Sequence, residues 1–228
     1  MAEVAFCECD YGVLAHDYWQ KKAKAKQQAR LDKLFANAGI PEHFRSFSFE
    51  SLLKRSGNDP GKRPAIDAAM SFARDGYLID SKSQRYKTGL ILAGPCGMAK
   101  TGLLTPVISA FLERGKSALW IEVYDLISEI QDGYSTGESV KRLEAARGAD
   151  IILLDDLGDA DRDMIETDDR RRIIFQLINH RYNAGLPTLI TSNLQGAQIA
   201  QQFGARVFER IIESCVWINM TGKNLRME

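Results

Sequence analysis

The segment Gly94–Thr101 (GPCGMAKT) combines glycines with a lysine and a hydroxyl side chain. Glycines let consecutive backbone N–H groups converge on phosphate oxygens, and the N-terminus of a following helix adds a favourable dipole. In such a loop Lys100 reaches the β- and γ-phosphates of a nucleotide, and the Thr101 hydroxyl binds Mg²⁺. The expected members of this phosphate-binding loop are Gly94, Pro95, Cys96, Gly97, Met98, Ala99, Lys100 and Thr101. The alternative is a glycine-rich turn between a strand and a helix, with Lys100 on the surface.

Ala99 departs from the usual loop pattern, which has glycine immediately before the Lys-Thr pair. If this position requires a positive φ, alanine is strained there by roughly 1–2 kcal/mol. If Ala99 is instead the first helical residue, the substitution costs little. Pro106 is a second departure, because a proline inside the following helix removes a hydrogen bond and should kink it.

Acidic and amide side chains follow two later apolar runs. Asp155 and Asp156 end the run DIILLDD, and Asn193 follows TLITS. Beside a phosphate loop, we expect Asp155 to hold Mg²⁺, Asp156 to act as the general base and Asn193 to hold the attacking water. Taken alone, a pair of aspartates or an asparagine at such a place is often only a helix cap or a turn.

Arginines near the C-terminus are candidates for stabilising transferred phosphate. Arg206 and Arg210 are four residues apart on one face of a predicted helix, and Arg226 follows the last apolar run. An arginine finger offered to a neighbouring subunit contributes several powers of ten to hydrolysis. Ion pairs with Glu209 and Glu213 within the helix are the simpler explanation.

These residues require a scaffold in which strands and helices alternate from Thr88 onward. Near-continuous apolar strands separated by helices indicate a parallel sheet covered on both faces, with its active edge at the carboxyl ends of the strands. The predicted strands are 88–93, 117–123, 150–156, 188–192 and 215–220. The predicted helices in this part are 102–114, 125–130, 140–146, 170–184, 197–203 and 205–213, and residues 76–87 are expected to be irregular.

The N-terminal part of the chain differs in composition from the region of alternating strands and helices. Asp17–Asn37 is rich in Ala, Lys and Gln without Gly or Pro, which predicts a basic helix. This helix is either a solvated element that packs only at its end or an arm for a partner or nucleic acid. Cys7 and Cys9 are too few for a zinc site of their own, which favours free thiols.

The overall composition limits the partners and the location that we expect for the chain. The formal net charge is zero, which argues against a protein that coats DNA throughout its surface. No apolar run is long enough to span a membrane and no signal peptide is evident, so we expect no membrane partner and a cytoplasmic location.

From about Leu34 onward, the chain resembles the DnaC/DnaI/IstB group of AAA+ ATPases, which comprises replicative helicase loaders of bacteria and phages and ATPase subunits of some transposons. The matching stretches are AGIP (38–41) with Phe44 and FSF (47–49), the loop 94–101, LLDDLG (153–158), NHRY (179–182), PTLITSNL (187–194), RVFERI (206–211) and GKNLR (222–226). The resemblance covers most of the chain, with these motifs in the family order.

The resemblance implies a P-loop NTPase fold of the AAA+ type, with a five-stranded parallel sheet flanked by helices and no C-terminal helical lid. It implies ATP and Mg²⁺ as cofactors, with Lys100 and Thr101 in Walker A, and Asp155 and Asp156 in Walker B. Asn193 matches sensor 1. Arg210 matches the arginine finger with Arg206 as its companion, and Arg226 matches sensor 2. Residues 1–40 would be a short helical arm left from a partner-binding region, and residues 41–228 the ATPase domain.

The implied function is that of a helicase loader which binds and hydrolyses ATP in DNA replication. Its implied partners are a DnaB-type ring helicase, single-stranded DNA and further copies of itself in nucleotide-dependent oligomers. Two alternatives stay open: an IstB-like accessory ATPase of a transposase, and a nucleotide-binding adaptor with little catalysis. The departures at Ala99 and Pro106 predict weak ATP turnover, and they are the reason for considering the adaptor.

Overall fold

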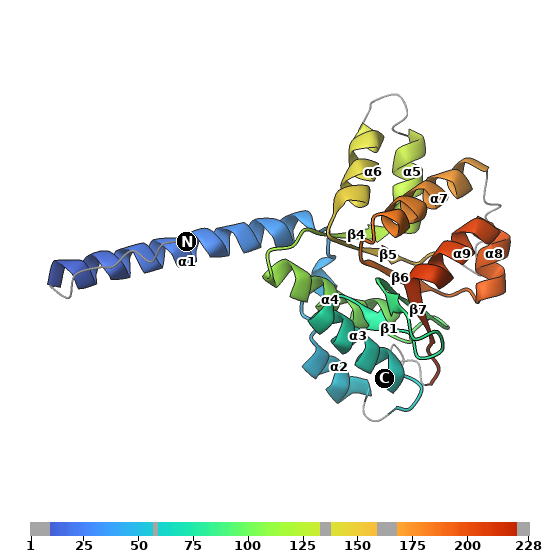
Figure 1. Cartoon of the computed structure of the whole chain (residues 1–228), viewed down its shortest axis with the longest axis horizontal. Coiled ribbons are helices and arrows are strands. Elements are labelled where there is room, and N and C mark those ends of the chain that lie inside the picture. Colours follow the sequence, from blue (N-terminus) through green and yellow to red (C-terminus); the bar gives the residue numbers. More distant parts are fainter. Residues whose placement is uncertain (1–9, 57–58, 133–137, 159–167, 223–228) are drawn as a thin grey trace.

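The computed structural model describes residues 10–56, 59–132, 138–158 and 168–222. Its centre is a five-stranded sheet in the order β4-β5-β6-β3-β7, in which every neighbouring pair of strands is parallel (Figure 1). The strands are β3 (Gly89–Ala93), β4 (Ala118–Glu122), β5 (Ile151–Asp155), β6 (Thr188–Ser192) and β7 (Cys215–Asn219). The predicted α/β class is confirmed, and each strand begins and ends within one residue of its predicted range.

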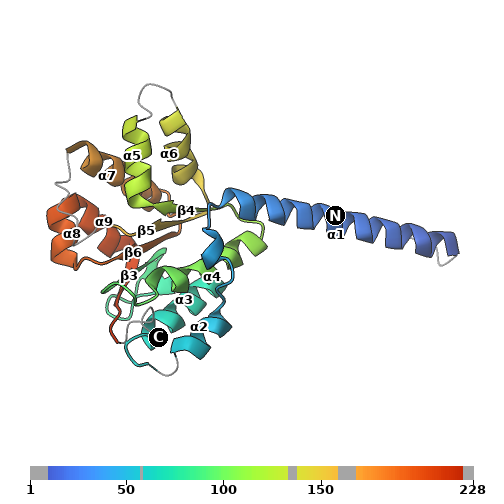
Figure 2. The same cartoon turned by 180° about the vertical axis from the view of Figure 1, so that it is seen from behind.

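Helices cover both faces of this sheet, as the views from front and back show (Figures 1 and 2). Before β3 lie α1 (Asp10–Asn37), the 3-10 turn η1 (Glu42–Phe44), α2 (Phe49–Ser56) and α3 (Arg63–Asp75). After β3 follow α4 (Lys100–Glu113), α5 (Val123–Asp132), α6 (Glu138–Gly148), α7 (Asp168–Asn183), α8 (Gly196–Phe203) and α9 (Ala205–Ser214).

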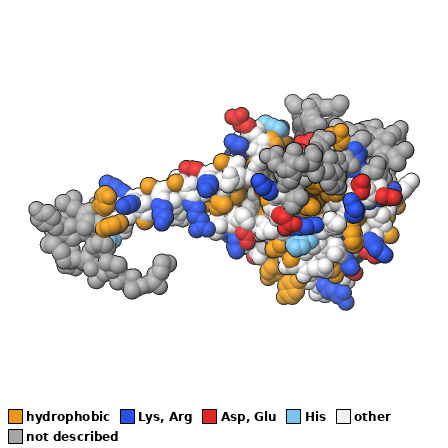
Figure 3. All heavy atoms as spheres, turned by 90° about the horizontal axis from the view of Figure 1, so that it is seen from above, with side chains coloured by type: hydrophobic (Ala, Val, Ile, Leu, Met, Phe, Trp, Pro, Cys, Tyr) orange, Lys and Arg blue, Asp and Glu red, His pale blue; other side chains and the backbone are white. Residues whose placement is uncertain are grey.

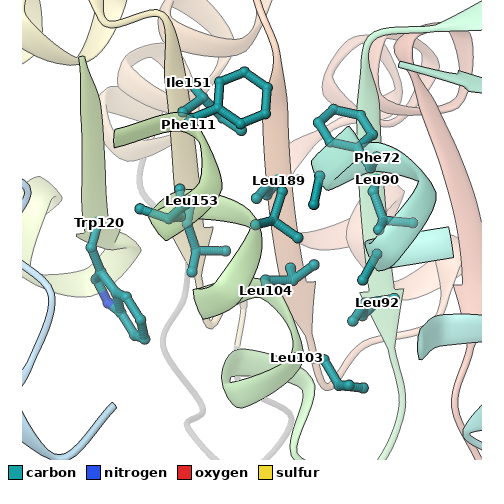
Figure 4. Packing of buried hydrophobic residues seen from close by; sticks show 14 of the residues in the cluster. Phe72, Leu90, Leu92, Leu103, Leu104, Phe111, Trp120, Ile151, Leu153 and Leu189 are labelled. Atoms are coloured by element: carbon teal, nitrogen blue, oxygen red, sulfur yellow. The ribbon is translucent and has the colours of Figure 1, made fainter. Parts of the chain in front are cut away.

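The apolar runs of the strands feed two separate cores because successive side chains point to opposite faces of the sheet. Leu90 and Leu92 of β3 pack with α3 and α4 on one face, where Trp120 also lies (Figure 4). Ile91 of the same strand packs on the other face, with residues of α5, α7 and α9. Burial on both sides explains why these strands read as continuous apolar runs rather than as alternating patterns.

The prediction for residues 76–87 is wrong in one respect. This segment contains a short antiparallel pair, β1 (Leu78–Ile79) with β2 (Tyr86–Lys87). The turn between them is held by Asp80, whose Oδ2 accepts hydrogen bonds from the amide and the hydroxyl of Ser83. Strands of two residues are too short to give a period-2 pattern, so the sequence carried no signal for them.

The helix α1 extends well beyond the rest of the molecule and packs on it only near its C-terminal end (Figures 1 and 2). The predicted division into an arm of residues 1–40 and a domain of residues 41–228 stays a prediction. Cys7, Cys9 and Arg226 lie outside the described residues, and of the part after β7 only 220–222 is described. Among the described helices, none combines the length and the apolar character needed to cross a membrane.

Candidate nucleotide-binding site

The loop 94–99 joins β3 to α4 at the carboxyl edge of the sheet, where open parallel sheets bind their ligands. A cavity of about 460 Å³ lies against this loop, a volume typical of small-molecule sites. The residues that line it are His43, Phe44, Phe47, Leu52, Arg55, Cys96, Gly97, Met98, Ala99, Lys100, Thr101, Gly102, Asp156 and Asn193.

Lys100 is the first residue of α4, and its side chain is buried. Its Nζ donates hydrogen bonds to the carbonyl oxygens of Gly94 (2.7 Å) and Pro95 (2.9 Å) and to Oδ1 of Asn193 (2.7 Å). The ammonium group is therefore fixed between the loop and the end of β6. A phosphate that enters the cavity meets a positive charge already in place.

Asn193 follows β6 directly and is half-buried. Because its Oδ1 accepts a hydrogen bond from Lys100, its NH₂ group remains the donor side of the amide. That group can donate to a phosphate oxygen or to a water molecule. The structure thus brings Asn193 to Lys100 across 93 residues of sequence.

Thr101 and Asp155 form the second link between the loop and the sheet. The Thr101 hydroxyl lies 2.9 Å from Oδ1 of Asp155, which also accepts a hydrogen bond from Thr191 at 2.6 Å. Burial raises the pKa of Asp155 to about 6, although the bonds from the two threonines oppose this shift. A bound divalent cation would favour the ionised form.

The donor set fits magnesium. A hydroxyl and a carboxylate are the hard oxygen ligands that Mg²⁺ takes. Neighbouring ligands of an octahedral Mg²⁺ lie about 3.0 Å apart when its bonds are near 2.1 Å, and Thr101 Oγ1 and Asp155 Oδ1 are separated by 2.9 Å. Within the described residues, no cluster of three His, Cys, Asp or Glu side chains offers a rival metal site.

Asp156 differs from its neighbour in both exposure and backbone. Its side chain is exposed and lines the cavity, and its φ is 53°. Aspartate is among the few residues that tolerate this left-handed region. Its amide donates to Thr191 Oγ1 at 2.9 Å, so a single threonine holds both aspartates. The turn therefore leaves the Asp155 carboxylate buried at the end of β5 and exposes the Asp156 carboxylate to solvent.

The arginines of α9 lie elsewhere. Arg206 is exposed, and neither it nor Arg210 lines the cavity. The Arg210 guanidinium lies 4.5 Å from the centre of the Tyr182 ring and donates to Asn179 (3.1 Å) and Glu213 (2.6 Å). The ion pair considered from the sequence therefore exists, and the side chain is held in one place while remaining about one-third exposed.

Comparison with known proteins identifies the family. The sequence model of the IstB-like ATP binding proteins matches residues 80–228. The chain belongs to this IstB-like family. It is also similar to the replicative helicase loader DnaI of Bacillus subtilis, with 22% identity over 90% of this chain and 66% of DnaI, so it spans somewhat less than two thirds of that relative. The helicase loader DnaC of Escherichia coli is 24% identical over 88% of this chain and 81% of DnaC.

The fold agrees with this assignment. A crystal structure of the DnaC helicase loader superposes with a TM-score of 0.66, covering 79% of this chain and all of that chain at 20% identity. The IstB-like chain thus has the P-loop AAA+ fold that its sequence predicted.

Several residues of this IstB-like site carried no usable signal in the sequence. His43, Phe44, Phe47 and Arg55 line the same cavity as the loop, although they precede it by about forty residues or more. The close approach is specific, because a Cβ on Gly102 would lie 2.8 Å from the Phe47 ring. The matching FSF stretch pointed to the family but not to this contact. Thr191 was missed because it stands inside an apolar strand.

The two alternatives for Ala99 are also resolved. Ala99 precedes α4 with φ 62° and ψ 27°, which is the left-handed region. The position therefore favours glycine, and the IstB-like chain carries the strain of an alanine there, roughly 1–2 kcal/mol. One helix continues through Pro106, and the Thr105 hydroxyl donates to the carbonyl oxygen of Thr101 in the turn before it.

Proposed function

We propose that this IstB-like chain binds ATP with Mg²⁺ in the cavity beside the loop 94–101 and hydrolyses it. Lys100 neutralises the β- and γ-phosphates, while Thr101 and Asp155 bind the metal. Asp156 accepts a proton from the attacking water, and Asn193 orients that water. The backbone amides of the loop hold the remaining phosphate oxygens.

The observation that carries this proposal is the meeting of three strand ends at one loop. Lys100 contacts Asn193 after β6, and Thr101 contacts Asp155 at the end of β5, while both begin the helix that follows β3. In an ordinary strand–helix turn with a surface lysine, we would expect neither the Lys100–Asn193 contact nor the Thr101–Asp155 contact. The family, whose members are described as ATP-binding, supports the choice of nucleotide.

Nucleotide binding and phosphate release by matched variants test the proposal. We expect Lys100→Ala to lose ATP binding, because the fixed ammonium is removed. Asp156→Asn should bind ATP normally and lose at least about 100-fold in turnover, in line with the contribution of a general base. Lys54→Ala, an exposed lysine on α2, is the control for charge. Unchanged turnover in Asp156→Asn would remove that residue from the mechanism.

We further propose that the chain acts in DNA replication, in the cytoplasm, on a DnaB-type ring helicase and single-stranded DNA. The DnaI and DnaC relatives, both named as replicative helicase loaders, support this. The test is co-sedimentation of the chain with such a helicase, with and without ATP, followed by helicase loading on a single-stranded circle. Absence of any helicase complex would reject the loader role without touching ATP binding.

A transposase-accessory role is the second candidate, and the match to the IstB-like family model favours it. Such a protein is expected to bind duplex DNA more tightly when ATP is present. A loader is expected to prefer single strands. Competition between the two forms of DNA across a salt titration decides between them.

The third candidate is an adaptor that binds nucleotide with little catalysis, and the left-handed Ala99 at the start of α4 is the observation behind it. Tight ATP binding without measurable phosphate release, and recovery of release in Ala99→Gly, would support it. Normal turnover by the unmodified chain would reject it.

We also propose that nucleotide drives self-association, with Arg210 offered to the γ-phosphate of a neighbouring copy and Arg206 as its companion. The support is that Arg210 is held outside its own cavity yet stays partly exposed. Arg226, in the position matching sensor 2, would act on nucleotide of the same chain.

A further inference from the structure

The feature that the ATPase chemistry does not use is the helix α1. Every side chain described from Tyr18 to Arg30 is exposed to solvent. The helix docks only at its end, where Leu34 and Phe35 pack on the core and an Arg30 Nη donates to the Gly115 carbonyl oxygen at 3.4 Å. The rest projects from the molecule (Figures 1 and 2). Because most of this long helix packs against nothing in the described part of the chain, its exposed side chains are candidates for a binding role.

The charge along most of this arm is predominantly positive. Residues 18–33 contain six Lys or Arg side chains and a single carboxylate, Asp32. Asp32 accepts a hydrogen bond from Gln28 at 2.8 Å. Within the described part of the chain, no carboxylate pairs with Lys22, Lys26 or Lys33. Since the whole chain is neutral, the arm concentrates positive charge in one place. In the view of Figure 3, Lys and Arg side chains are spread along the arm.

Four of these cations fall on one side of the helix. Lys22, Lys26, Arg30 and Lys33 are spaced by four, four and three residues, which places them in a stripe at 3.6 residues per turn. At a rise of 1.5 Å per residue, the stripe is about 16 Å long, the scale of a few nucleotides. Lys21 and Lys24 lie off this stripe, about 100° or more from its centre.

Two aromatic side chains continue the stripe toward the outer end. Tyr18 and Trp19 are 59% and 54% exposed, and their ring centres are 5.6 Å apart. Lys22 Nζ lies 5.8 Å from the Tyr18 ring centre and 5.0 Å from that of Trp19. Exposed rings beside basic side chains are what unstacked bases and their phosphates bind to.

Other uses of the arm fit less well. A coiled-coil seam or a membrane-surface helix needs apolar residues along one face. Between Trp19 and Leu34 the apolar residues are Ala23, Ala25, Ala29 and Leu31, which are scattered around the helix. Helix propensity rather than packing keeps this stretch helical. Charge and aromatic stacking therefore remain as the means of binding.

We propose that α1 is a binding arm for single-stranded nucleic acid. The stripe of Lys22, Lys26, Arg30 and Lys33 contacts the phosphates, and Tyr18 with Trp19 stacks on the bases. The inference deepens the proposed action on single-stranded DNA by naming where on this chain the strand is bound. It requires neither ATP hydrolysis nor the helicase.

The test compares two variants of the full-length chain that lose equal charge from the same helix. Lys22→Gln with Lys26→Gln removes half of the stripe, and Lys21→Gln with Lys24→Gln is the matched control. Binding of a labelled dT20 oligonucleotide is measured between 50 and 300 mM salt without nucleotide. We expect the stripe variant to bind at least about tenfold more weakly at 0.1 M salt, with a salt slope smaller by about 1.4, because each lost phosphate contact removes about 0.7.

A second readout follows the aromatic residues. Binding of dT20 should quench tryptophan fluorescence, and Trp19→Phe should lose most of that change, because the tryptophan in contact with the bases is gone. Circular dichroism of every variant verifies that the helix persists. A 20-base-pair duplex run in parallel should bind more weakly than dT20, and tighter duplex binding would overturn the single-strand assignment.

The outcomes separate this inference from the proposed function. Equal dT20 binding by stripe and control variants, with binding still present, rejects the arm and leaves the loader role intact. No binding by any variant rejects both the arm and the action on single-stranded DNA. If the stripe variant loses a helicase complex but keeps dT20 affinity, the arm binds an acidic protein surface instead.

Discussion

At the scale of single residues, the backbone strain at Ala99 should lower the free energy of unfolding by a measurable amount. Its left-handed backbone (φ 62°) is one that glycine adopts freely. We expect Ala99→Gly to stabilise the chain by about 1 kcal/mol, or about 2–4 °C in Tm, because relief of strain exceeds the added freedom of the unfolded chain. Urea unfolding measures this. Ala110→Gly within α4 is the control and should lose about 1 kcal/mol. A destabilised Ala99→Gly would mean that this backbone conformation is not the native one.

Cysteine reactivity reports on the same loop. Cys96 is exposed in the loop, whereas Cys215 is buried, and burial raises the pKa of its thiol to about 11. In a background with Cys7→Ser and Cys9→Ser, we expect a thiol reagent to label Cys96 quickly and Cys215 only after unfolding. ATP with Mg²⁺ should slow the labelling several-fold, because Cys96 lines the cavity. Labelling that ATP does not affect would argue against nucleotide at this loop.

At the residue scale, the sequence was enough to predict which side chains lie at the site, but not every backbone conformation there. Lys100, Thr101, Asp155 and Asn193 were predicted, and the structure brings them into contact. Their types and places after apolar runs carry that information, because parallel strands end at one edge of a sheet. The φ of Ala99 could not be predicted, because one sequence fits either a loop or a helical start.

At the scale of elements, the contact between α4 and the segment before α2 is tight. A Cβ on Gly102 would meet the Phe47 ring at 2.8 Å, so Gly102→Ala should cost about 1–3 kcal/mol despite the better helix propensity of alanine. Phe47→Leu in the same chain should relieve most of this cost. A double-mutant cycle in urea measures the coupling. Independent, additive effects would show that the ring yields without penalty.

Buried Arg181 of α7 ties three elements together. Its guanidinium donates to the carbonyl oxygens of Ala146 and Ala149 near the end of α6 and of Pro187 before β6. Arg181→Met removes these donors and leaves buried carbonyls without partners, which should cost at least about 3 kcal/mol. Thermal unfolding measures the loss, and exposed Arg172→Met on the same helix is the control. A cost below about 1 kcal/mol would mean that water replaces the arginine.

Contacts between distant elements explain which parts of the fold could not be predicted from the sequence. The strands were located within one residue because burial on both faces leaves unbroken apolar runs. The placement of His43 and Phe44 at the cavity depends on how residues 38–56 pack on α4 and β4. That packing is a tertiary contact between distant segments, and no local period or turn signal encodes it.

At the scale of the whole molecule, the position of Arg210 bears on assembly. The side chain does not line its own cavity, and it is held by Tyr182, Asn179 and Glu213 while about one-third exposed. A fixed, accessible guanidinium outside its own site suits a γ-phosphate bound by another copy. Arg210→Ala should therefore retain ATP binding, because nothing at the loop changes. Its turnover should fall by about 10³-fold or more if the arginine acts as a finger.

Mixing two inactive variants tests whether that phosphate belongs to a neighbour. Lys100→Ala cannot use its own site but still offers Arg210, whereas Arg210→Ala has an intact site and no finger. If assembly places them side by side, the mixture should hydrolyse ATP where each alone does not, and activity per chain should rise steeply with concentration. The surface pair of Arg210 with Glu213 contributes little to stability, but Arg210→Ala also loses the contacts with Tyr182 and Asn179. Thermal unfolding of the variant therefore verifies that a loss of activity does not reflect unfolding. A mixture as inactive as its components, with both variants folded, would place any role of Arg210 within its own chain.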